Sequence, residues 1–444
     1  MIPLAGAPVA PIAAHQVLVF LLQLGLLLGL AMALGRLASR FGLPAIVGEL
    51  TAGVLAGPSV LGHAAPGVWS WLLPNDPGQF HLLDAVGQLG VLLLVGVAGM
   101  HIDLGLMRRN KLAVASVGSG ALLIPLGLGI AAGFVLPATL LAGGTRPTFA
   151  LFLGVAMCVS AIPVIAKTLL EMKLLHRDVG QLIINSAAID DIIGWFLLAI
   201  VAAMATSGTG SGALGHAAIA LVVIIAVTIA ARPLVRGAMH VAGRSSEPGV
   251  TVAVATILVL LASAGSQALG VEAILGAFLC GILIGSAREL DRQRLTPLRT
   301  FVMTVLAPIF FATAGLRIDL TALVRPSVLL AGVVVLVLAI AGKFAGAYLG
   351  ARLARKDHWS ALALGAGLNA RGVVEVVVAT VGLRLGVLGE ATYTIIILVA
   401  IATSLMAPPM LRYAARRIDV TPEENHRALV FAGGRPLMST EGAA

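Results

Sequence analysis

Five ionisable side chains interrupt long apolar stretches of this sequence, and they are of types that bind cations and protons. Asp190 and Asp191 are adjacent in "SAAIDDIIGW", Lys343 lies in "LAIAGKFAGA", and "GLNARGVVEV" holds Arg371 and Glu375. On insertion scales, each such residue costs roughly 2.5–3.5 kcal/mol at the middle of a membrane-spanning helix. We therefore expect these side chains to face one another inside a helical bundle, with partners or water.

The adjacent acids cannot both point in one direction, because consecutive residues of a helix are about 100° apart. One of Asp190 and Asp191 is expected to face a cavity, while the other lies closer to a neighbouring helix. A carboxylate in such a cavity can hold a proton at one moment and a small alkali cation at the next, because both compete for the same oxygens. That competition could couple cation movement to proton movement. The alternative is an aspartate that caps a broken helix or bonds a backbone amide.

The remaining three charges also need partners. Lys343 lies too far before Arg352 to reach water easily by extending its side chain, so we expect it to pair with an aspartate of the 190–191 segment. Arg371 and Glu375 are spaced i, i+4, which allows an intrahelical ion pair as well as direct participation in an ion pathway. Glu49 and Glu272 are expected to be structural or to lie at the membrane surface.

Composition places these residues in an integral membrane protein. The 444-residue chain is 59% hydrophobic and 11% charged, with a mean hydropathy of +1.04. The formal net charge is +9, but Lys and Arg fall in short clusters between apolar segments, where they set membrane orientation and do not indicate nucleic-acid binding. Cys158 and Cys280 both lie within apolar segments, so we expect neither a disulfide nor a metal site from them.

The apolar runs predict an all-α polytopic protein with about thirteen membrane-spanning helices. Loops after odd-numbered spans carry clusters of Lys and Arg, and loops after even-numbered spans carry few. The positive-inside rule then predicts an N-terminus outside and a cytoplasmic tail from Arg416 onward. The predicted spans cover 15–36, 44–62, 80–101, 112–136, 148–170, 181–205, 216–235, 249–267, 270–287, 297–316, 327–351, 359–382 and 391–413.

Two pairs of segments indicate an inverted repeat. "VGELTAGVLAGPS" in the second span and "LGAFLCGILIGSA" in the ninth share three glycines at matching places, and "AGMHIDL" (98–104) matches "AGLRIDL" (314–320) at five of seven positions. The partners are an odd number of crossings apart, so they run in opposite directions, as in many secondary transporters. The matched glycines are Gly48, Gly53 and Gly57 in one segment and Gly276, Gly281 and Gly285 in the other.

The fifth and twelfth spans, which correspond in this repeat, are expected to be broken crossing helices. Ser160 and Pro163 lie in the middle of the fifth span, and Asn369 lies among glycines in the twelfth. Proline removes a backbone donor and glycine loosens a helix, so freed carbonyls could line a cavity and bind a cation. A simple kink at each place is the alternative, and Ser160 could equally be a small packing residue.

Six motifs together resemble the second monovalent cation:proton antiporter family, which includes bacterial Na⁺/H⁺ and K⁺/H⁺ exchangers and plant cation/H⁺ exchangers. They are "LPAIVGELTAGVLAGPSVLG", "AIPVIAKTLLE", "SAAIDDIIGW", "ILGAFLCGILIG", "LAPIFFATAGLRIDL" and "GLNARGVVEVVV", and the resemblance runs from about residue 15 to 414. It implies a homodimer whose transmembrane antiporter domain covers 1–414 and is followed by a short polar tail at 415–444. Helices 1–3 and 8–10 would form the dimerisation part, helices 4–6 and 11–13 the transport core, and helix 7 the linker.

The resemblance also implies roles for residues. Asp191 would be the carboxylate that binds the alkali cation, Asp190 its partner, and Lys343 the charge partner of Asp190, with Ser160 close by. Two acids and a lysine favour two protons per cation and electrogenic exchange, by alternating access of the core. No cofactor is implied. Sodium-handling relatives often have the order "RGE", whereas this chain has "RGVVE". We favour Na⁺, with Li⁺ as a further substrate, and the motif leaves K⁺ open as the alternative.

Other functions remain as alternatives. A cation channel needs a filter-like sequence, which is not evident. A Na⁺-coupled organic-anion transporter would place its substrate beside adjacent acids that repel it. A membrane enzyme needs a nucleophile or metal set, and the histidines show no ligand spacing. We therefore expect an antiporter that contributes to pH homeostasis in a bacterial inner membrane, with Na⁺ or K⁺, H⁺ and lipid as its partners and no nucleic acid.

Overall fold

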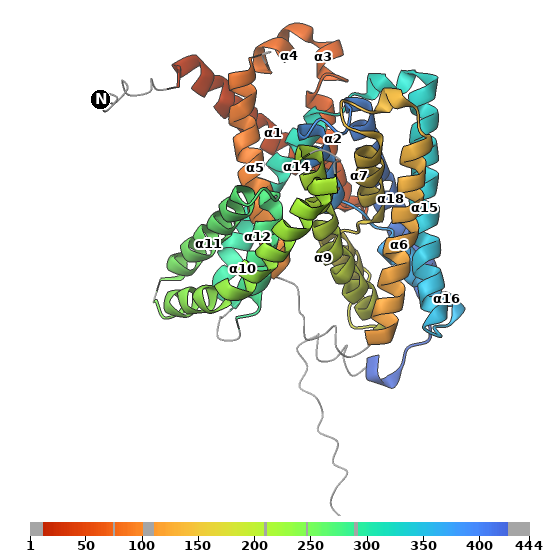
Figure 1. Cartoon of the computed structure of the whole chain (residues 1–444). Helices are drawn as coiled ribbons and strands as arrows, with labels where there is room; N and C mark the ends of the chain where they lie inside the picture. Colours follow the sequence, from red (N-terminus) through yellow and green to blue (C-terminus); the bar gives the residue numbers. More distant parts are fainter. Residues whose placement is uncertain are drawn as a thin grey trace, which may run out of the picture.

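The structure is a computed structural model that describes residues 12–73, 76–100, 111–207, 211–245, 247–287 and 292–424. The described part is almost entirely helical, and it contains an isolated β-bridge between Leu141 and Leu388. In Figure 1, α3 and α4 lie at the upper end of the bundle and α16 begins at its lower end. We use "upper end" and "lower end" in this sense.

Ten described helices are long and apolar enough to cross a membrane, or eleven if the bent pair α16 and α17 counts as one span. The α-helices are α1 (Ala14–Arg40), α2 (Ala45–Ala56), α3 (Leu61–Ala64), α4 (Pro66–Leu72), α5 (Pro77–Met100), α6 (Lys111–Val135), α7 (Arg146–Cys158), α8 (Ile162–Glu171), α9 (Asp178–Ser207), α10 (Ser211–Gly243), α11 (Pro248–Ala268), α12 (Ala273–Gly285), α13 (Thr296–Phe301), α14 (Ala307–Leu316), α15 (Pro326–Leu353), α16 (His358–Leu368), α17 (Val373–Arg384) and α18 (Glu390–Ala415). Shorter elements are the 3₁₀ helices η2 (Ala138–Leu140), η3 (Arg292–Leu295) and η5 (Leu320–Val324), and the π-helix η4 (Val302–Leu306).

The predicted spans all overlap described helices, but several boundaries differ. The fifth predicted span is α7 and α8, and the ninth is the short helix α12; these two fall outside the ten or eleven spans counted by length. The second predicted span is not one helix to residue 62, because α2 ends at Ala56 before a Gly-Pro pair. The seventh predicted span ends at residue 235, whereas α10 continues to Gly243.

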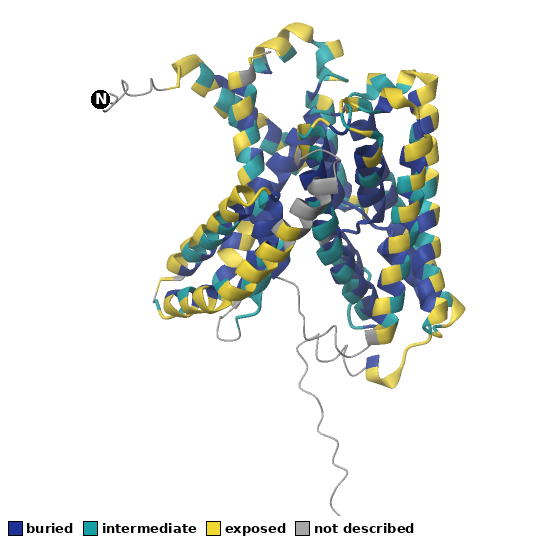
Figure 2. Cartoon of the chain, in the orientation of Figure 1, coloured by how far each residue is buried: buried dark blue, intermediate teal, exposed yellow. Residues whose placement is uncertain are grey.

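The surface and the interior of the bundle follow from the composition. Leu21 on α1, Ile229 on α10 and Leu330 on α15 expose more than half of their surface, as suits helices that face lipid. Figure 2 shows such exposed residues along the outer helices and buried residues between them. The polar residues that are buried, including Asp190 and Lys343, therefore lie among tightly packed apolar side chains.

Glycine contacts show the inverted repeat in three dimensions. A Cβ atom added to Gly53 on α2 would overlap the carbonyl oxygen of Ala312 on α14, and one added to Gly281 on α12 would overlap that of Gly96 on α5. These two close approaches are equivalent under the repeat, because α2 corresponds to α12 and α14 corresponds to α5. The 98–104 segment can be followed only to residue 100, because 101–104 lie outside the described residues.

A third close approach joins the two halves of the repeat directly. Gly120 on α6 and Gly346 on α15 each face the carbonyl oxygen of the other, so that a Cβ on either would overlap it. These helices are the fourth and eleventh predicted spans, which are partners in the repeat. Small residues let their backbones approach closely.

The helices form two groups that α10 connects in sequence. In the first helix group, α1 packs on α2, α2 on α14, and α5 on α12, which in turn packs on α11. In the second helix group, α6 packs on α7 and α15, and α16 on α15 and α18, with α8, α9 and α17 beside them. Figure 1 shows α5, α11 and α12 of the first group on the left and α6, α15 and α16 of the second on the right.

Candidate functional site

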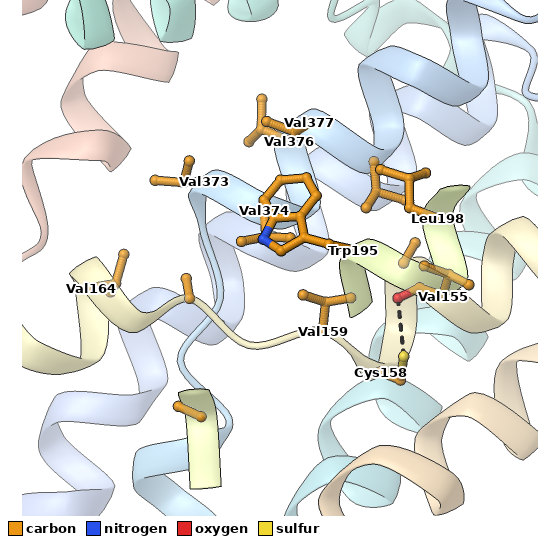
Figure 3. Close-up of a cluster of buried hydrophobic side chains, with 14 of the residues drawn as sticks. Val155, Cys158, Val159, Val164, Trp195, Leu198, Val373, Val374, Val376 and Val377 are labelled. Atoms are coloured by element: carbon orange, nitrogen blue, oxygen red, sulfur yellow. Dashed lines mark hydrogen bonds between the residues drawn. The ribbon is translucent and has the colours of Figure 1, made fainter. Parts of the chain in front are cut away.

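Two helices break at the same place in the second helix group. α7 ends at Cys158 and α8 begins at Ile162, while α16 ends at Leu368 and α17 begins at Val373, with a bend of 42° between α16 and α17. Figure 3 shows the unwound chain beside Val159 and the start of α17 at Val373. Both interruptions that the repeat predicts are therefore present.

The two breaks are bonded to each other. The backbone N–H of Ala161 donates to the carbonyl of Ala370 at 3.3 Å, and Ser160 Oγ donates to the carbonyl of Leu368 at 3.2 Å. Each break thus satisfies polar groups that the other leaves without a helical partner, which is required for irregular backbone at membrane depth.

Cationic side chains cap the C-terminal end of α7. Arg371 donates from Nη1 to the carbonyl of Ala156 at 2.9 Å and from Nη2 to that of Met157 at 2.6 Å, and Lys343 Nζ donates to the carbonyl of Cys158. The last carbonyls of a helix lack intrahelical partners and form the negative end of its dipole, so cations are favoured there. The sequence had suggested that freed carbonyls bind the transported cation. At the end of α7 the protein's own cations hold these carbonyls instead.

Asp190 on α9 is paired and fully buried. Lys343 Nζ lies 2.7 Å from Asp190 Oδ2, and Ser160 Oγ donates to the same oxygen at 3.0 Å. The side chains of Asp190 and Lys343 are both 0% exposed. Lys343 therefore links Asp190 of α9 to the C-terminal end of α7. Asp190 is the acid that the sequence resemblance paired with Lys343.

Asp191 lies in different surroundings from its neighbour. It is 2% exposed, and its Oδ1 atom, like Oδ1 of Asp190, has no hydrogen-bond partner. The backbone N–H of Ile162, at the beginning of α8, donates to its carboxylate. A helix N-terminus favours negative charge, so α8 stabilises the charged form of this carboxylate at one oxygen, while the other oxygen stays free. A free carboxylate oxygen is a group that a proton or an alkali cation can bind.

Arg371 and Glu375 form the ion pair that their spacing allows. Arg371 Nη1 lies 3.2 Å from Glu375 Oε1, and Nη2 also donates to the carbonyl of Ala339 on α15 at 3.3 Å. Ser404 Oγ of α18 donates to the backbone carbonyl of Arg371 at 2.5 Å. Arg371 therefore holds α7, α15 and α17 together at the break, and Glu375 keeps one buried oxygen, Oε2, without a partner.

Two other predicted residues lie at the breaks. Asn369 is fully buried, and both polar atoms of its amide lack a hydrogen-bond partner. Buried polar atoms without partners are uncommon and call for water or an ion beside them. Pro163 is the second residue of α8, and its side chain lies outside the described residues.

The five buried ionisable side chains of the site carry a net charge of −1 when all of them are ionised. Asp190, Asp191, Lys343, Arg371 and Glu375 form what we call the central charged cluster. When all are ionised, its three carboxylates exceed its two cations by one negative charge. One monovalent cation or one proton is enough to balance that charge.

Polar groups at the helix ends fix the elements that carry the cluster. Thr145 caps α7 by accepting from the backbone N–H of Thr148 at 3.4 Å, and Asp357 caps α16 by accepting from that of Ser360 at 3.0 Å. Partial burial acts to raise the pKa of the Asp357 carboxyl, but hydrogen bonds from Ser360 and nearby backbone amides hold this pKa below its usual value.

The segment after α18 fixes the beginning of α9. Glu424 lies in the predicted polar tail, and its Oε2 atom lies 3.0 Å from Arg177 Nε. Its Oε1 atom accepts from the backbone N–H of Asp178, the first residue of α9, at 2.6 Å. The rest of the tail, from residue 425, lies outside the described residues.

Sequence reasoning missed several groups of the site. The carbonyls of Ala156, Met157 and Cys158 carry no signal in their residue types, because backbone groups do not depend on the side chain. Ser404 could have been noticed as a polar residue in an apolar span. Trp195 also escaped notice, although it lies one turn after Asp191 and its ring is 5.8 Å from that of Phe278 on α12.

Comparisons with known proteins agree with this architecture. Residues 26–416 match the family model described as sodium/hydrogen exchanger, transmembrane. The Na⁺/H⁺ antiporter NhaS4 of Synechocystis is 30% identical over 406 residues, which cover 89% of this chain and 97% of that protein. The Na⁺/H⁺-K⁺ antiporter GerN of Bacillus cereus is 27% identical over 89% of this chain and 96% of its own length.

A plant relative and a solved structure extend the comparison. Cation/H⁺ antiporter 20 of Arabidopsis thaliana is 29% identical over 88% of this chain, but the chain spans only 47% of that relative. The structure of the sodium proton antiporter MjNhaP1 from Methanocaldococcus jannaschii has the same fold, with a TM-score of 0.65 and 18% identity over 90% of this chain and 99% of that one. From the family match and the relative at 30% identity, the chain belongs to the sodium/hydrogen exchanger family of transmembrane antiporters, which are transporters and not enzymes.

Proposed function

We propose that this protein exchanges a monovalent cation for protons at Asp191, with Na⁺ as the favoured cation. One observation carries the proposal: Asp191 is buried beside a break in two helices, and one of its carboxylate oxygens has no partner. Its neighbour Asp190 also keeps one oxygen, Oδ1, without a partner, but its other oxygen is engaged by Lys343 and Ser160. The free oxygen of Asp191 can accept either ion, and competition for it couples the two movements.

Lys343 gives Asp190 a second part in the exchange. While the pair is intact, Lys343 neutralises Asp190 and caps the end of α7. When a cation binds, Asp191 releases one proton and Lys343 can release a second, while Asp190 stays ionised; both protons return when the cation leaves. Two acids and one lysine in this arrangement support two protons per cation, so exchange would move net charge and respond to membrane potential.

Movement of the second helix group against the first would give alternating access to the site. The whole central charged cluster lies in the second helix group, on α9, α15 and α17 and, for Arg371, in the break before α17. The first helix group carries the matched glycine contacts between α2 and α14 and between α5 and α12, which suit a rigid scaffold. We assign dimerisation to this scaffold, transport to the second helix group, and the link to α10.

The distribution of cations supports an orientation in the membrane. Arg352 lies in the last turn of α15, at the lower end where α16 begins, and Arg36 and Arg40 lie in the last turns of α1, on the opposite side from its N-terminus. By the positive-inside rule this end faces the cytoplasm, so that the N-terminus lies outside and the tail lies inside. A bacterial inner membrane is the setting we propose, with a role in pH homeostasis.

The choice of cation rests on the relatives and on one motif. NhaS4 is named for sodium, whereas GerN is named for sodium and potassium. The order Arg-Gly-Val-Val-Glu at 371–375 resembles potassium-handling members, and K⁺/H⁺ exchange is therefore the second candidate.

The proposal is tested by reconstitution of the purified protein in liposomes that contain a pH-sensitive dye. Na⁺, Li⁺ and K⁺ are added separately at several imposed membrane potentials, with protein-free liposomes as the control. We expect Na⁺ to drive proton movement, at a rate that changes with potential. Movement with K⁺ alone would favour the second candidate, and no movement with any of the three would refute the exchange.

A further inference from the structure

A cleft lies between the two helix groups at the upper end. It is a small cleft, lined by α5, α12 and α14 of the first group and by α17 of the second. Polar side chains from both groups reach it, including Asp84, Arg317, Thr380 and Arg384. A space that is lined by both groups must change shape when one group moves against the other.

One ion pair joins the two groups at this cleft. Arg384 is the last residue of α17, and its Nη2 atom lies 2.5 Å from Oε2 of Glu272, which precedes α12. Glu272 is 8% exposed and the side chain of Arg384 is 41% exposed. Because α17 begins at the break and carries Glu375 in its first turn, the pair connects the broken helix to the first helix group.

A second ion pair at the same end offers a contrast. Arg317 Nη2 of α14 lies 2.6 Å from both carboxylate oxygens of Asp84 on α5. Both helices belong to the first group, so this pair need not break when the second group moves. The chain thus supplies a matched control of the same chemistry in the same cleft.

Further contacts join the groups near the pair. Tyr393 Oη of α18 donates to the carbonyl of Ala314 on α14 at 2.8 Å, and Thr394 Oγ1 accepts from the backbone N–H of Asp319 at 3.1 Å. The Trp195 ring of α9 packs against Phe278 of α12, and Figure 3 shows it among the valines of α17. The groups are therefore tied together between the central charged cluster and the upper end.

We propose that Glu272 and Arg384 form the gate at the upper end of the transport pathway: the pair holds the two helix groups together there in the state that the structure shows, and it separates when the second helix group moves. This inference rests on the proposed alternating access. A partly exposed ion pair is weak enough to open in each cycle. Even a weak ion pair shifts the equilibrium between the two states of the transporter, because it forms in only one of them.

Labelling of a reporter cysteine tests the gate without assaying transport. Thr380→Cys lines the cleft and can react with a membrane-impermeant maleimide added from the outside. We expect Glu272→Gln and Arg384→Gln each to raise the labelling rate at least threefold, and the exchanged pair Glu272→Arg with Arg384→Glu to restore it. Asp84→Asn should leave the labelling rate within twofold of the rate without this substitution. Equal rates in wild type and both single variants would overturn the proposal.

Reversible cross-linking tests whether the pair must open. Glu272→Cys with Arg384→Cys is joined by a short bis-methanethiosulfonate in a background where Ser replaces the native cysteines, Cys158 and Cys280. We expect cross-linking to stop cation-driven proton movement and a reductant to restore it. Cross-linked Asp84→Cys with Arg317→Cys should keep exchanging. Full exchange in the cross-linked Glu272/Arg384 protein would overturn the gate.

The two proposals fail in different ways. A wild-type protein that moves no protons with any alkali cation defeats the proposed function. A wild type that exchanges normally, beside a cross-linked variant that exchanges at the same rate, defeats the gate alone.

Discussion

Replacement of Lys343 by methionine removes the cation that two parts of the site share. The methionine keeps the length and apolar volume of the side chain, but it leaves Asp190 without its counter-ion and the carbonyl of Cys158 without its donor. Both atoms remain buried, because Asp190 is 0% exposed. The substitution therefore tests the pairing itself and adds little change in packing.

The size of the loss follows from these two interactions. Removal of one partner from a buried ion pair costs about 3–5 kcal/mol, and a buried carbonyl without a donor costs about 1–3 kcal/mol. Proton uptake by Asp190 limits the first cost, so we expect Lys343→Met to lower the free energy of unfolding by about 3–5 kcal/mol in all. In domains of 150–250 residues, a loss of 1 kcal/mol in the free energy of unfolding lowers the midpoint of thermal unfolding by about 2–4 °C. In a longer chain the same loss lowers the midpoint by less.

The assay is thermal unfolding of the purified protein in detergent, followed by tryptophan fluorescence, in a double-mutant cycle with Asp190→Asn. We expect the double variant to regain most of the stability that Lys343→Met loses, because no buried charge is then left unpaired. A loss that is equally large in the Asp190→Asn background would show no coupling between the two side chains, and our account of the pair would be refuted.

Other variants test the remaining parts of the account. Arg371→Lys should lower the free energy of unfolding by about 2–4 kcal/mol in the same thermal assay, because one amine cannot keep all the hydrogen bonds of the guanidinium group; an unchanged midpoint would contradict its role at the break. Gly53→Ala and Gly281→Ala should each cost about 1–3 kcal/mol, since both would overlap a facing carbonyl, whereas Gly25→Ala has no neighbour within 4 Å and should cost nothing; tolerance of either would count against the repeat contacts. Glu424→Gln should free the end of the chain, so limited proteolysis after residue 415 should speed up several-fold, and an equal cleavage rate would argue against this contact.

The sequence predicts much of the site because charges inside a membrane must find partners. Charge burial alone indicated that Lys343 needs an aspartate, and the angle between adjacent residues indicated different surroundings for Asp190 and Asp191. The choice between the two acids depends on how α9 is rotated, which its packing against α6, α7, α10 and α16 decides. Residue chemistry therefore left that choice open, and the family resemblance assigned the lysine to Asp190, where the structure places it.

Some features could not be predicted because backbone and boundary effects decide them. Lys343 and Arg371 bond the carbonyls at the end of α7, which depends on where that helix stops and on no side-chain type. α10 runs on through Arg232 and Arg236, since arginine favours helices and a helix need not end at the membrane surface. The ion pair of Glu272 joins helices far apart in the sequence, so no local pattern reveals it.

The most direct measurement compares wild type, Asp191→Asn and Asp191→Glu for cation-dependent proton movement in liposomes. Asparagine keeps the shape of the side chain but cannot exchange a proton for a cation, whereas glutamate keeps the carboxylate. We predict that exchange disappears in Asp191→Asn and persists at a reduced rate in Asp191→Glu, while thermal unfolding shows both variants folded. Exchange at the wild-type rate in a folded Asp191→Asn protein would contradict the claim that protons and cations compete for this carboxylate.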